Sequence, residues 1–209
     1  MKSYFIKQYQ KAPAILGDMP EPVMNDDDVL VEVCAAGLNH LDLRIKSGEF
    51  KMLVPYSFPL ILGHDVAGKV VAVGKNVRQF AVGDEVFARP RDGRIGAFAE
   101  KIAIHQDDAA KKPNNLSMAD AAGLPNVFLQ LAMYFLSRGV RCASCRKKVD
   151  YQFLFMQANG KQLAQIAQLV EQGHIKPYTQ SVYPFEEINQ AFDELEQGRT
   201  RGKIVVSMR

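Results

Sequence analysis

The 209-residue sequence contains no G-x-G-x-x-G turn, although 15 glycines are distributed along it. Such a turn brings backbone amides and a helix N-terminus onto a pyrophosphate, so its absence excludes a preformed cradle of that kind. No apolar run approaches the ~18 residues of a membrane span, and residues 1–10 lack the apolar segment of a secretory signal. We therefore expect no membrane association and a cytoplasmic location.

Cysteine is scarce, and the three present are Cys34, Cys142 and Cys145. An odd number without a secretory signal predicts reduced thiols. Cys142 and Cys145 form a CxxC pair, but no second CxxC or histidine pair follows at finger-like spacing. Neighbouring basic residues are able to lower a thiol pKa, so a redox or metal role stays open beside an incidental pair.

The sequence also lacks a large excess of either charge, because 26 basic and 23 acidic residues interleave and give a net charge of +3. This balance predicts a mixed solvated surface and no nucleic-acid partner. Five basic residues cluster in 138–148, but no aromatic residue interleaves with them. The apolar content of 47% is enough to bury a core in one or two soluble domains.

Short β-branched runs interrupted by turn residues dominate the first half of the chain. They predict strands in 29–35, 66–73, 82–87 and 96–105. Apolar residues occupy both phases of 29–35, so we expect this strand to be buried on both faces. The series is typical of a small twisted barrel or a strongly bent sheet.

The last third of the chain is helical before it returns to strand. Ser117 is a candidate helix cap. Apolar residues at helical spacing predict helices in 161–172 and 185–197, each followed at once by a glycine that ends it. A final strand is predicted in 202–206.

Several of these segments together resemble the medium-chain dehydrogenase/reductase superfamily, and in particular its zinc-independent quinone oxidoreductase branch. The motifs that carry the resemblance are Gly37-Leu-Asn-His-Leu-Asp42, Gly63-His-Asp-Val-Ala-Gly68, Val71-Ala-Val-Gly74, Val82-Gly-Asp-Glu-Val86 and Ala121-Ala-Gly-Leu-Pro125. The end of the chain is similar to the family's ending in three places, which are 151–156, the helix from Phe185 and 198–206.

The resemblance implies a mainly β, α+β fold. A GroES-like barrel in residues 1–125 would be completed by a C-terminal helix and strand in 176–209, and 126–175 would be a helical remnant of a Rossmann domain. Only 24 residues separate Asn126 from Tyr151, whereas one βαβ unit needs about 30. We therefore predict that most of the nucleotide-binding domain is absent from this sequence.

The resemblance also implies NADPH-dependent hydride transfer, in which the cofactor carries the chemistry. By resemblance, Asn39 is the catalytic residue that faces the nicotinamide and the substrate, and Gly202 and Lys203 approach the cofactor. From the residues alone, Asn39 in a loop turn and Lys203 as a solvated lysine remain alternative interpretations. Asp42 is expected to cap a short helix.

The same resemblance assigns Arg44, Phe50, His64 and Asn126 to the substrate pocket, with Arg44 and Phe50 where some quinone reductases have tyrosines. Zinc alcohol dehydrogenases with this barrel bind their catalytic zinc through a cysteine, a histidine and a second cysteine. The corresponding residues here are Asn39, His64 and, nearby in sequence, Asn126. One ligand of three cannot hold zinc, so we expect no metal site and a structural role for His64.

Two functions stay open. The first is an NADPH-dependent quinone or enone reductase by descent, impaired because the phosphate-binding groups of the family lie in the missing domain. It implies NADP, a small quinone or enone as partner, and leaves open a homodimer that rebuilds the cofactor site. The second is a non-catalytic barrel that keeps a substrate pocket or an assembly surface.

Overall fold

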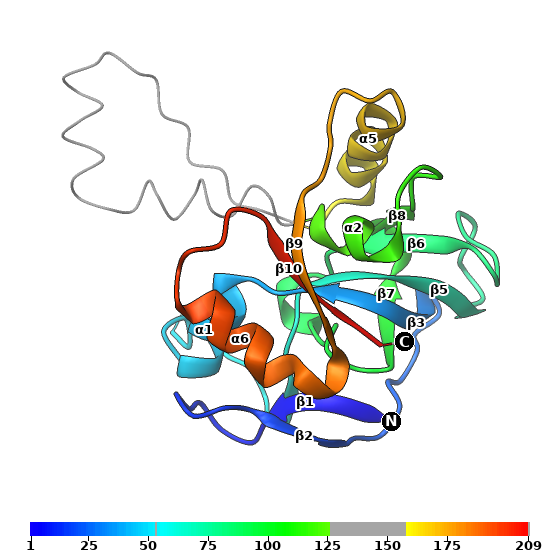
Figure 1. Ribbon diagram of the computed structural model, residues 1–209. Coiled ribbons are helices and arrows are strands. Elements are labelled where there is room, and N and C mark those ends of the chain that lie inside the picture. Colours follow the sequence, from blue (N-terminus) through cyan, green and yellow to red (C-terminus); the bar gives the residue numbers. More distant parts are fainter. Residues whose placement is uncertain (53, 126–157, 209) are drawn as a thin grey trace, which may run out of the picture.

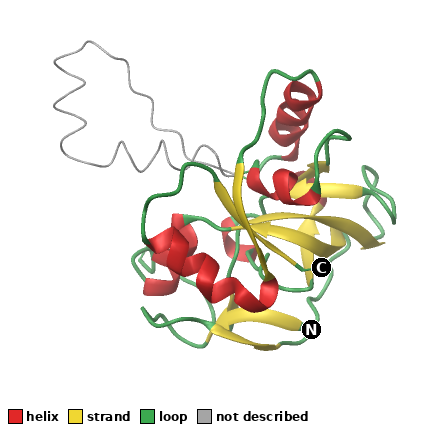
Figure 2. Ribbon diagram, viewed as in Figure 1, coloured by secondary structure: helices red, strands yellow, loops and turns green. Residues whose placement is uncertain are grey.

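The computed structural model describes residues 1–52, 54–125 and 158–208. The described strands form two sheets with helices on their outside (Figure 1, Figure 2). The smaller sheet has the order β2 (Ile15–Asp18), β1 (Lys2–Ile6) and β4 (Leu60–Ile61). Both of its pairings are antiparallel, so the N-terminal strand lies in the middle of this sheet.

The larger sheet has seven strands in the order β8-β6-β5-β3-β10-β9, with β7 also paired to β3. The strands are β3 (Asp28–Gly37), β5 (Asp65–Val73), β6 (Glu85–Ala88), β7 (Lys101–His105), β8 (Ala109–Lys111), β9 (Thr179–Pro184) and β10 (Lys203–Ser207). All of the predicted strands are present, although those expected from 82 and from 96 begin only at Glu85 and Lys101.

Strand β3 organises this sheet. One edge of β3 pairs with β5 along its length, while the other edge pairs first with β7 and then with β10. The C-terminal strand therefore enters the sheet beside residues 35–37. This divided edge bends the sheet around the core.

The prediction that β3 is buried on both faces is wrong. Val29, Val31 and Val33 are buried, but the alternate positions in this stretch are only half-buried. The reason is visible at Glu32, which pairs with Lys69 of β5 and Lys101 of β7. Long charged side chains keep their ends in water, so this face cannot be fully covered.

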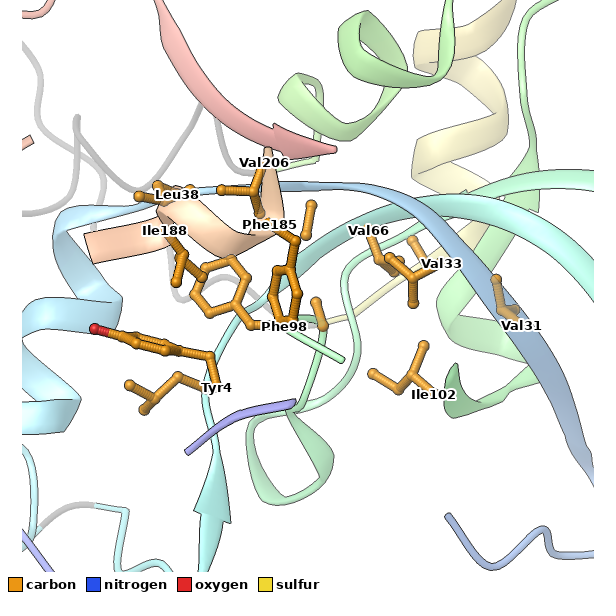
Figure 3. Packing of buried hydrophobic residues seen from close by; sticks show 14 of the residues in the cluster. Tyr4, Val31, Val33, Leu38, Val66, Phe98, Ile102, Phe185, Ile188 and Val206 are labelled. Atoms are coloured by element: carbon orange, nitrogen blue, oxygen red, sulfur yellow. The ribbon is translucent and has the colours of Figure 1, made fainter. Parts of the chain in front are cut away.

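Helix α6 (Ile188–Glu196) packs the C-terminal segment against the larger cluster of buried apolar residues, the main core. Its Phe192 ring stacks on the Tyr4 ring, with centroids 5.5 Å apart, and meets Phe98 edge-on at 5.7 Å. Figure 3 shows Phe185 and Ile188 beside Phe98, with Tyr4 below them. Each large apolar side chain buried in this way contributes about 1.5–3 kcal/mol.

A second apolar cluster lies beneath α2 (Met118–Gly123) and α5 (Gly160–Glu171), away from α6 (Figure 1). Ser117 caps α2 as predicted, accepting a hydrogen bond from Asp120 N at 3.1 Å. The predicted helix in 161–172 is confirmed as α5, which ends at Glu171, two residues before Gly173, whose φ is +78°. The expectations for Asn126, Cys142, Cys145 and the rest of 126–157 lie outside the described residues.

None of the helices in the described ranges is both long enough and apolar enough to cross a membrane.

Candidate functional site

The candidate site begins where β3 leads into α1 (His40–Ser47). Asn39 is the residue that precedes this helix, in extended backbone geometry. Asp42 Oδ2 accepts a hydrogen bond from Asn39 N at 2.9 Å, which confirms the predicted helix-capping role of Asp42. The two residues form a capping box, and the Asn39 side chain also binds groups from elsewhere in the chain.

Those groups come from two distant strands. Asn39 Nδ2 donates to Asp65 Oδ2 at 3.0 Å, and Lys203 Nζ donates to the same carboxylate oxygen at 2.9 Å and to Asn39 Oδ1. We call Asn39, Asp65 and Lys203 the Asn39 corner. It brings together two residues that the sequence assigned to the site, Asn39 and Lys203, and it adds Asp65, which sequence reasoning missed.

Hydrogen bonding within the corner fixes which atoms remain available. The two N–H groups of Asn39 face Asp65 Oδ2 and Gly37 O, the latter at 3.4 Å. Lys203 has three donors, and they face Asp65, Asn39 and Leu38 O. Neither Asn39 nor Lys203 therefore has a side-chain donor left for a ligand.

The ion pair between Lys203 and Asp65 in the corner is largely buried. Asp65 is fully buried, and burial raises the pKa of its carboxyl group, an increase that the Lys203 ammonium and the Asn39 amide oppose. Asp65 Oδ1 is buried and has no hydrogen-bond partner among the described residues. The corner is thus a buried ion pair that depends on both partners.

Gly202 is explained by packing inside the protein. A Cβ atom at Gly202 would lie 2.4 Å from Tyr178 Cδ1 and 2.6 Å from Tyr178 O, which is closer than any side chain tolerates. The backbone must approach Tyr178 here for β10 to begin beside β9. The cofactor contact assigned to Gly202 by resemblance remains a prediction.

His64 is fully buried and hydrogen-bonded to Asp42, with 2.6 Å between His64 Nδ1 and Asp42 Oδ1. Its Nε2 has no partner within residues 1–52, 54–125 and 158–208. Gly63, just before it, has a φ of +106°, and a Cβ there would lie 2.8 Å from Phe98 N. The local chain path that positions His64 therefore requires glycine at 63.

The residues of the described chain do not fit a catalytic zinc. His64 offers one ring nitrogen, but both N–H groups of Asn39 and one lone pair of its Oδ1 are engaged within the corner. No group of three or more His, Cys, Asp or Glu side chains that could hold a metal occurs in the ranges described. One nitrogen ligand is insufficient for zinc.

The other residues assigned to the substrate pocket lie apart from the corner's hydrogen bonds. Arg44 Nε lies 3.9 Å from Glu49 Oε2 at a half-exposed position. Phe50 is half-buried and packs against the main core cluster. Asn126 is outside the described residues, so the assignment of a substrate pocket to these side chains stays a prediction.

A groove of about 610 Å³ lies elsewhere, between β8 and α5. Residues on its walls include Phe80, Ala109, Ala164 and Gln168, and none of the sequence-assigned site residues that the structure describes lines it. Two of its three lysines are paired with carboxylates: Lys111 Nζ is 3.1 Å from Asp84 Oδ2 and Lys112 Nζ is 3.2 Å from Glu85 Oε2.

A dinucleotide fits the described residues only in part. The Asn39 corner is one buried polar position to which the end of a ligand could donate a hydrogen bond. No G-x-G-x-x-G turn occurs in the sequence to hold a pyrophosphate. The described residues therefore do not form a complete dinucleotide site.

Comparison with known proteins identifies the relatives of this chain. A family model described as zinc-binding dehydrogenase matches residues 57–206. The chain is 39% identical over 110 residues to the chloroplastic NADPH-dependent alkenal/one oxidoreductase of Arabidopsis thaliana, covering 50% of this chain and 28% of the relative. It is 37% identical over 107 residues to the chloroplastic quinone-oxidoreductase homolog of Spinacia oleracea, covering 51% and 32%. The chain thus spans about a third of the length of these curated relatives.

Solved structures show the same fold. The quinone oxidoreductase from Coxiella burnetii aligns with a TM-score of 0.79 at 18% identity, covering 100% of this chain and 99% of that one. An alcohol dehydrogenase superfamily protein from Novosphingobium aromaticivorans aligns with a TM-score of 0.79 at 20% identity, covering 100% of both chains. This likeness confirms the predicted fold class, a GroES-like barrel completed by the C-terminal helix and strand.

Proposed function

Because this chain belongs to the zinc-binding dehydrogenase family, within the quinone oxidoreductase-like branch of the medium-chain dehydrogenase/reductase superfamily, we propose that its substrate is a quinone or an enone reduced at the expense of NADPH. The family function is oxidoreduction. The observation that carries the proposal is the Asn39 corner, where a buried ion pair from two strands holds one asparagine amide in a fixed orientation.

In this proposal Asn39 is the residue nearest to the reacting groups, and Asp65 and Lys203 are positioning residues. The carboxylate holds the amide nitrogen and the ammonium holds the amide oxygen, so the Asn39 amide cannot flip without breaking both contacts. Because the donors of Asn39 and Lys203 are engaged within the corner, a ligand would bind there by donating its own N–H or O–H to an oxygen of the corner. A bound NADPH would supply the hydride; the chain supplies orientation.

We propose further that cofactor affinity is weak in this chain. Most of a dinucleotide's affinity in the family fold comes from the glycine-rich turn and the helix N-terminus at the pyrophosphate, and the sequence lacks that turn. The same absence favours the second candidate function, a non-catalytic barrel that keeps a binding or assembly surface. The two candidates differ in one property, which is turnover at high NADPH concentration.

The test is reduction of 1,4-naphthoquinone and of 3-buten-2-one at millimolar NADPH. The proposal predicts slow turnover that falls at least tenfold in Asn39→Ala and is unchanged in Asn25→Ala, an exposed asparagine whose hydrogen bonds with Asp28 are made by its backbone. Turnover that is absent in the wild type, or that is equal in Asn39→Ala, supports the non-catalytic barrel instead.

A further inference from the structure

The end of β6 carries a buried cation whose hydrogen-bonding capacity is largely unused. Arg89 is 4% exposed. Its Nη2 donates to Asp92 Oδ1 at 2.8 Å, while Nε and Nη1 are buried and have no partner in the part of the chain that the structure describes. A guanidinium has five N–H donors, and burial of an ionised group without acceptors is strongly unfavourable. Arg89 therefore lacks acceptors that a ligand could supply.

Two other arginines close in sequence, Arg91 and Arg94, use their guanidinium donors in ion pairs within the protein. Arg91 binds Asp108 through Nε and Nη2 at 2.7 and 2.9 Å, and Arg94 binds Asp28 through Nη1 and Nη2 at 2.8 and 2.7 Å. Both pairs are bidentate, although these arginine side chains are 46% and 30% exposed. Arg89 is the most buried of the three and has the fewest contacts, which is the reverse of what stability alone favours.

Tyr56 interacts electrostatically with Arg89 and Asp92. Tyr56 is half-buried, and burial together with the negative charges on Asp92 and Asp42 raises the pKa of its hydroxyl group, while the positive charge of Arg89 opposes the increase. In register, Ala88 lies opposite Val66, so Arg89 follows β6 at the edge where β5 begins. The unused N–H groups of the Arg89 guanidinium suit an anion.

Asp92 shows which kind of anion fits. Its side chain is 46% exposed, in contrast to 5% for Arg89, and it lies at the start of a three-residue 3-10 helix (Asp92–Arg94). A Cβ atom added at the adjacent Gly93 would meet nothing within 4 Å. The carboxylate of Asp92 can thus leave Arg89 for solvent without disturbing buried packing, and another carboxylate can take its position.

We propose that Arg89 forms a binding site for the carboxylate of a small organic acid, with Asp92 as the internal carboxylate that the ligand displaces. A carboxylate in the place of Asp92 would accept from Nη2 and from one of the unused donors, Nε or Nη1, in a bidentate pair. The inference deepens the proposed function and rests on it in one respect: the substrate is then a conjugated carbonyl compound that also carries a carboxylate. The carboxylate site itself depends only on Arg89 and its neighbours.

The test is equilibrium binding by calorimetry, without NADPH, of trans-4-oxo-2-pentenoate and of its neutral methyl ester. We expect the wild type to bind the acid at least tenfold more tightly than the ester. Arg89→Met should remove this preference and leave ester binding unchanged, and Asp92→Asn should strengthen acid binding because the competing carboxylate is gone. Arg78→Met, an exposed arginine whose side chain contacts only backbone oxygens in the described hydrogen bonds, should behave as the wild type.

Equal affinity of the wild type for acid and ester would overturn the proposal, as would an unchanged acid preference in a folded Arg89→Met. If Arg89→Met does not fold, Asp92→Asn decides, because unchanged acid affinity there refutes the displacement. Inorganic phosphate that binds as tightly as the acid would overturn the assignment to a carboxylate. Arg89-dependent binding of the acid without any NADPH-dependent turnover supports the site and refutes the proposed function, so the two failures are distinguishable.

Discussion

Lys203 Nζ lies 2.9 Å from Asp65 Oδ2, although 138 positions separate the two residues in the sequence. Both strands that carry them pair with the end of β3, where Gly37 lies opposite Asp65 on one side and Val205 on the other. A Cβ atom at Gly37 would lie 2.6 Å from Ala122 O, so glycine at this point lets α2 pack directly over the junction. The ion pair is thus positioned by the sheet and holds Asn39.

Removing the ammonium should make stability depend strongly on pH. In Lys203→Met the buried Asp65 carboxyl loses the cation that opposes its raised pKa, so that pKa rises further. A group with a raised folded-state pKa stabilises fully below its unfolded pKa of about 3.9, and this stability is lost as pH rises through the folded value. We expect Lys203→Met to lose about 3 kcal/mol at pH 8 and much less at pH 4.

Urea unfolding at both pH values measures this effect. Adding Asp65→Asn to Lys203→Met should recover most of the loss at pH 8, because the uncompensated charge is gone. Lys75→Met is the control, since Lys75 pairs with Asp26 on the surface with 73% and 55% of the two side chains exposed. It should change stability by less than about 0.5 kcal/mol. A loss in Lys203→Met that does not depend on pH would contradict the assignment.

The opposite pH dependence is expected at Asp28. Arg94 donates two hydrogen bonds to this buried carboxylate and lowers its pKa. A lowered folded-state pKa contributes stability above the unfolded pKa, and this contribution is lost as pH falls through the folded value. Asp28→Asn should therefore destabilise by about 2 kcal/mol at pH 7 and have little effect near pH 2. Asp26→Asn is the matched control, and equal effects of the two variants at pH 7 would refute the prediction.

The sequence predicted the helices and strands better than the roles of single buried charged residues. Alternation and glycine positions predicted the strands and α5, because those signals are local. The role of Asp65 depends on partners that strand pairing brings from distant parts of the sequence, and the role of Arg89 depends on donors that the fold leaves without acceptors. The spacing of residues in the sequence predicts neither. Sequence reasoning found Asn39 and Lys203 only through the family resemblance, and it found Asp42 through local helix-capping chemistry.

Boundaries were less predictable than elements for a related reason. The strand expected in 82–87 starts at Glu85 because residues 81–84 form a turn closed by hydrogen bonds from Ala81 N to Asp84 Oδ2 and from Asp84 N to Ala81 O. The glycine in this turn, Gly83, has a φ of +98°. An apolar valine at 82 imitates a strand residue, yet it is 64% exposed.

The C-terminal helix should be essential for the barrel. Phe192 is 3% exposed and contacts the rings of Tyr4 and Phe98, so Phe192→Ala should destabilise by about 3–5 kcal/mol. Truncation after Gly173 should abolish cooperative unfolding altogether, because β10 and α6 are lost together. Met52→Ala, at a position 90% exposed, should be neutral. A truncated chain that keeps a cooperative melt and native-like spectra would refute this account.

The purified protein should contain no stoichiometric zinc. The amide of Asn39 is engaged within the corner, and His64 supplies one nitrogen. Too few ligands are therefore left at the position where zinc alcohol dehydrogenases bind their catalytic zinc. Elemental analysis decides the matter. About one zinc per chain that disappears in the Cys142→Ser, Cys145→Ser double variant would show that the CxxC pair binds metal.

We propose that the Asn39 corner lies at the reacting groups and that this chain contains only a fragment of a cofactor site. Each 1.4 kcal/mol of lost phosphate contact weakens binding about tenfold, so an affinity that is typically micromolar should become millimolar at best. Titration of NADPH against the chain, followed by calorimetry and by quinone reduction in the same samples, tests this most directly. We predict no saturation below about 1 mM. Saturable micromolar binding with Asn39-dependent turnover would contradict the claim and show that the chain, alone or as a dimer, rebuilds a complete cofactor site.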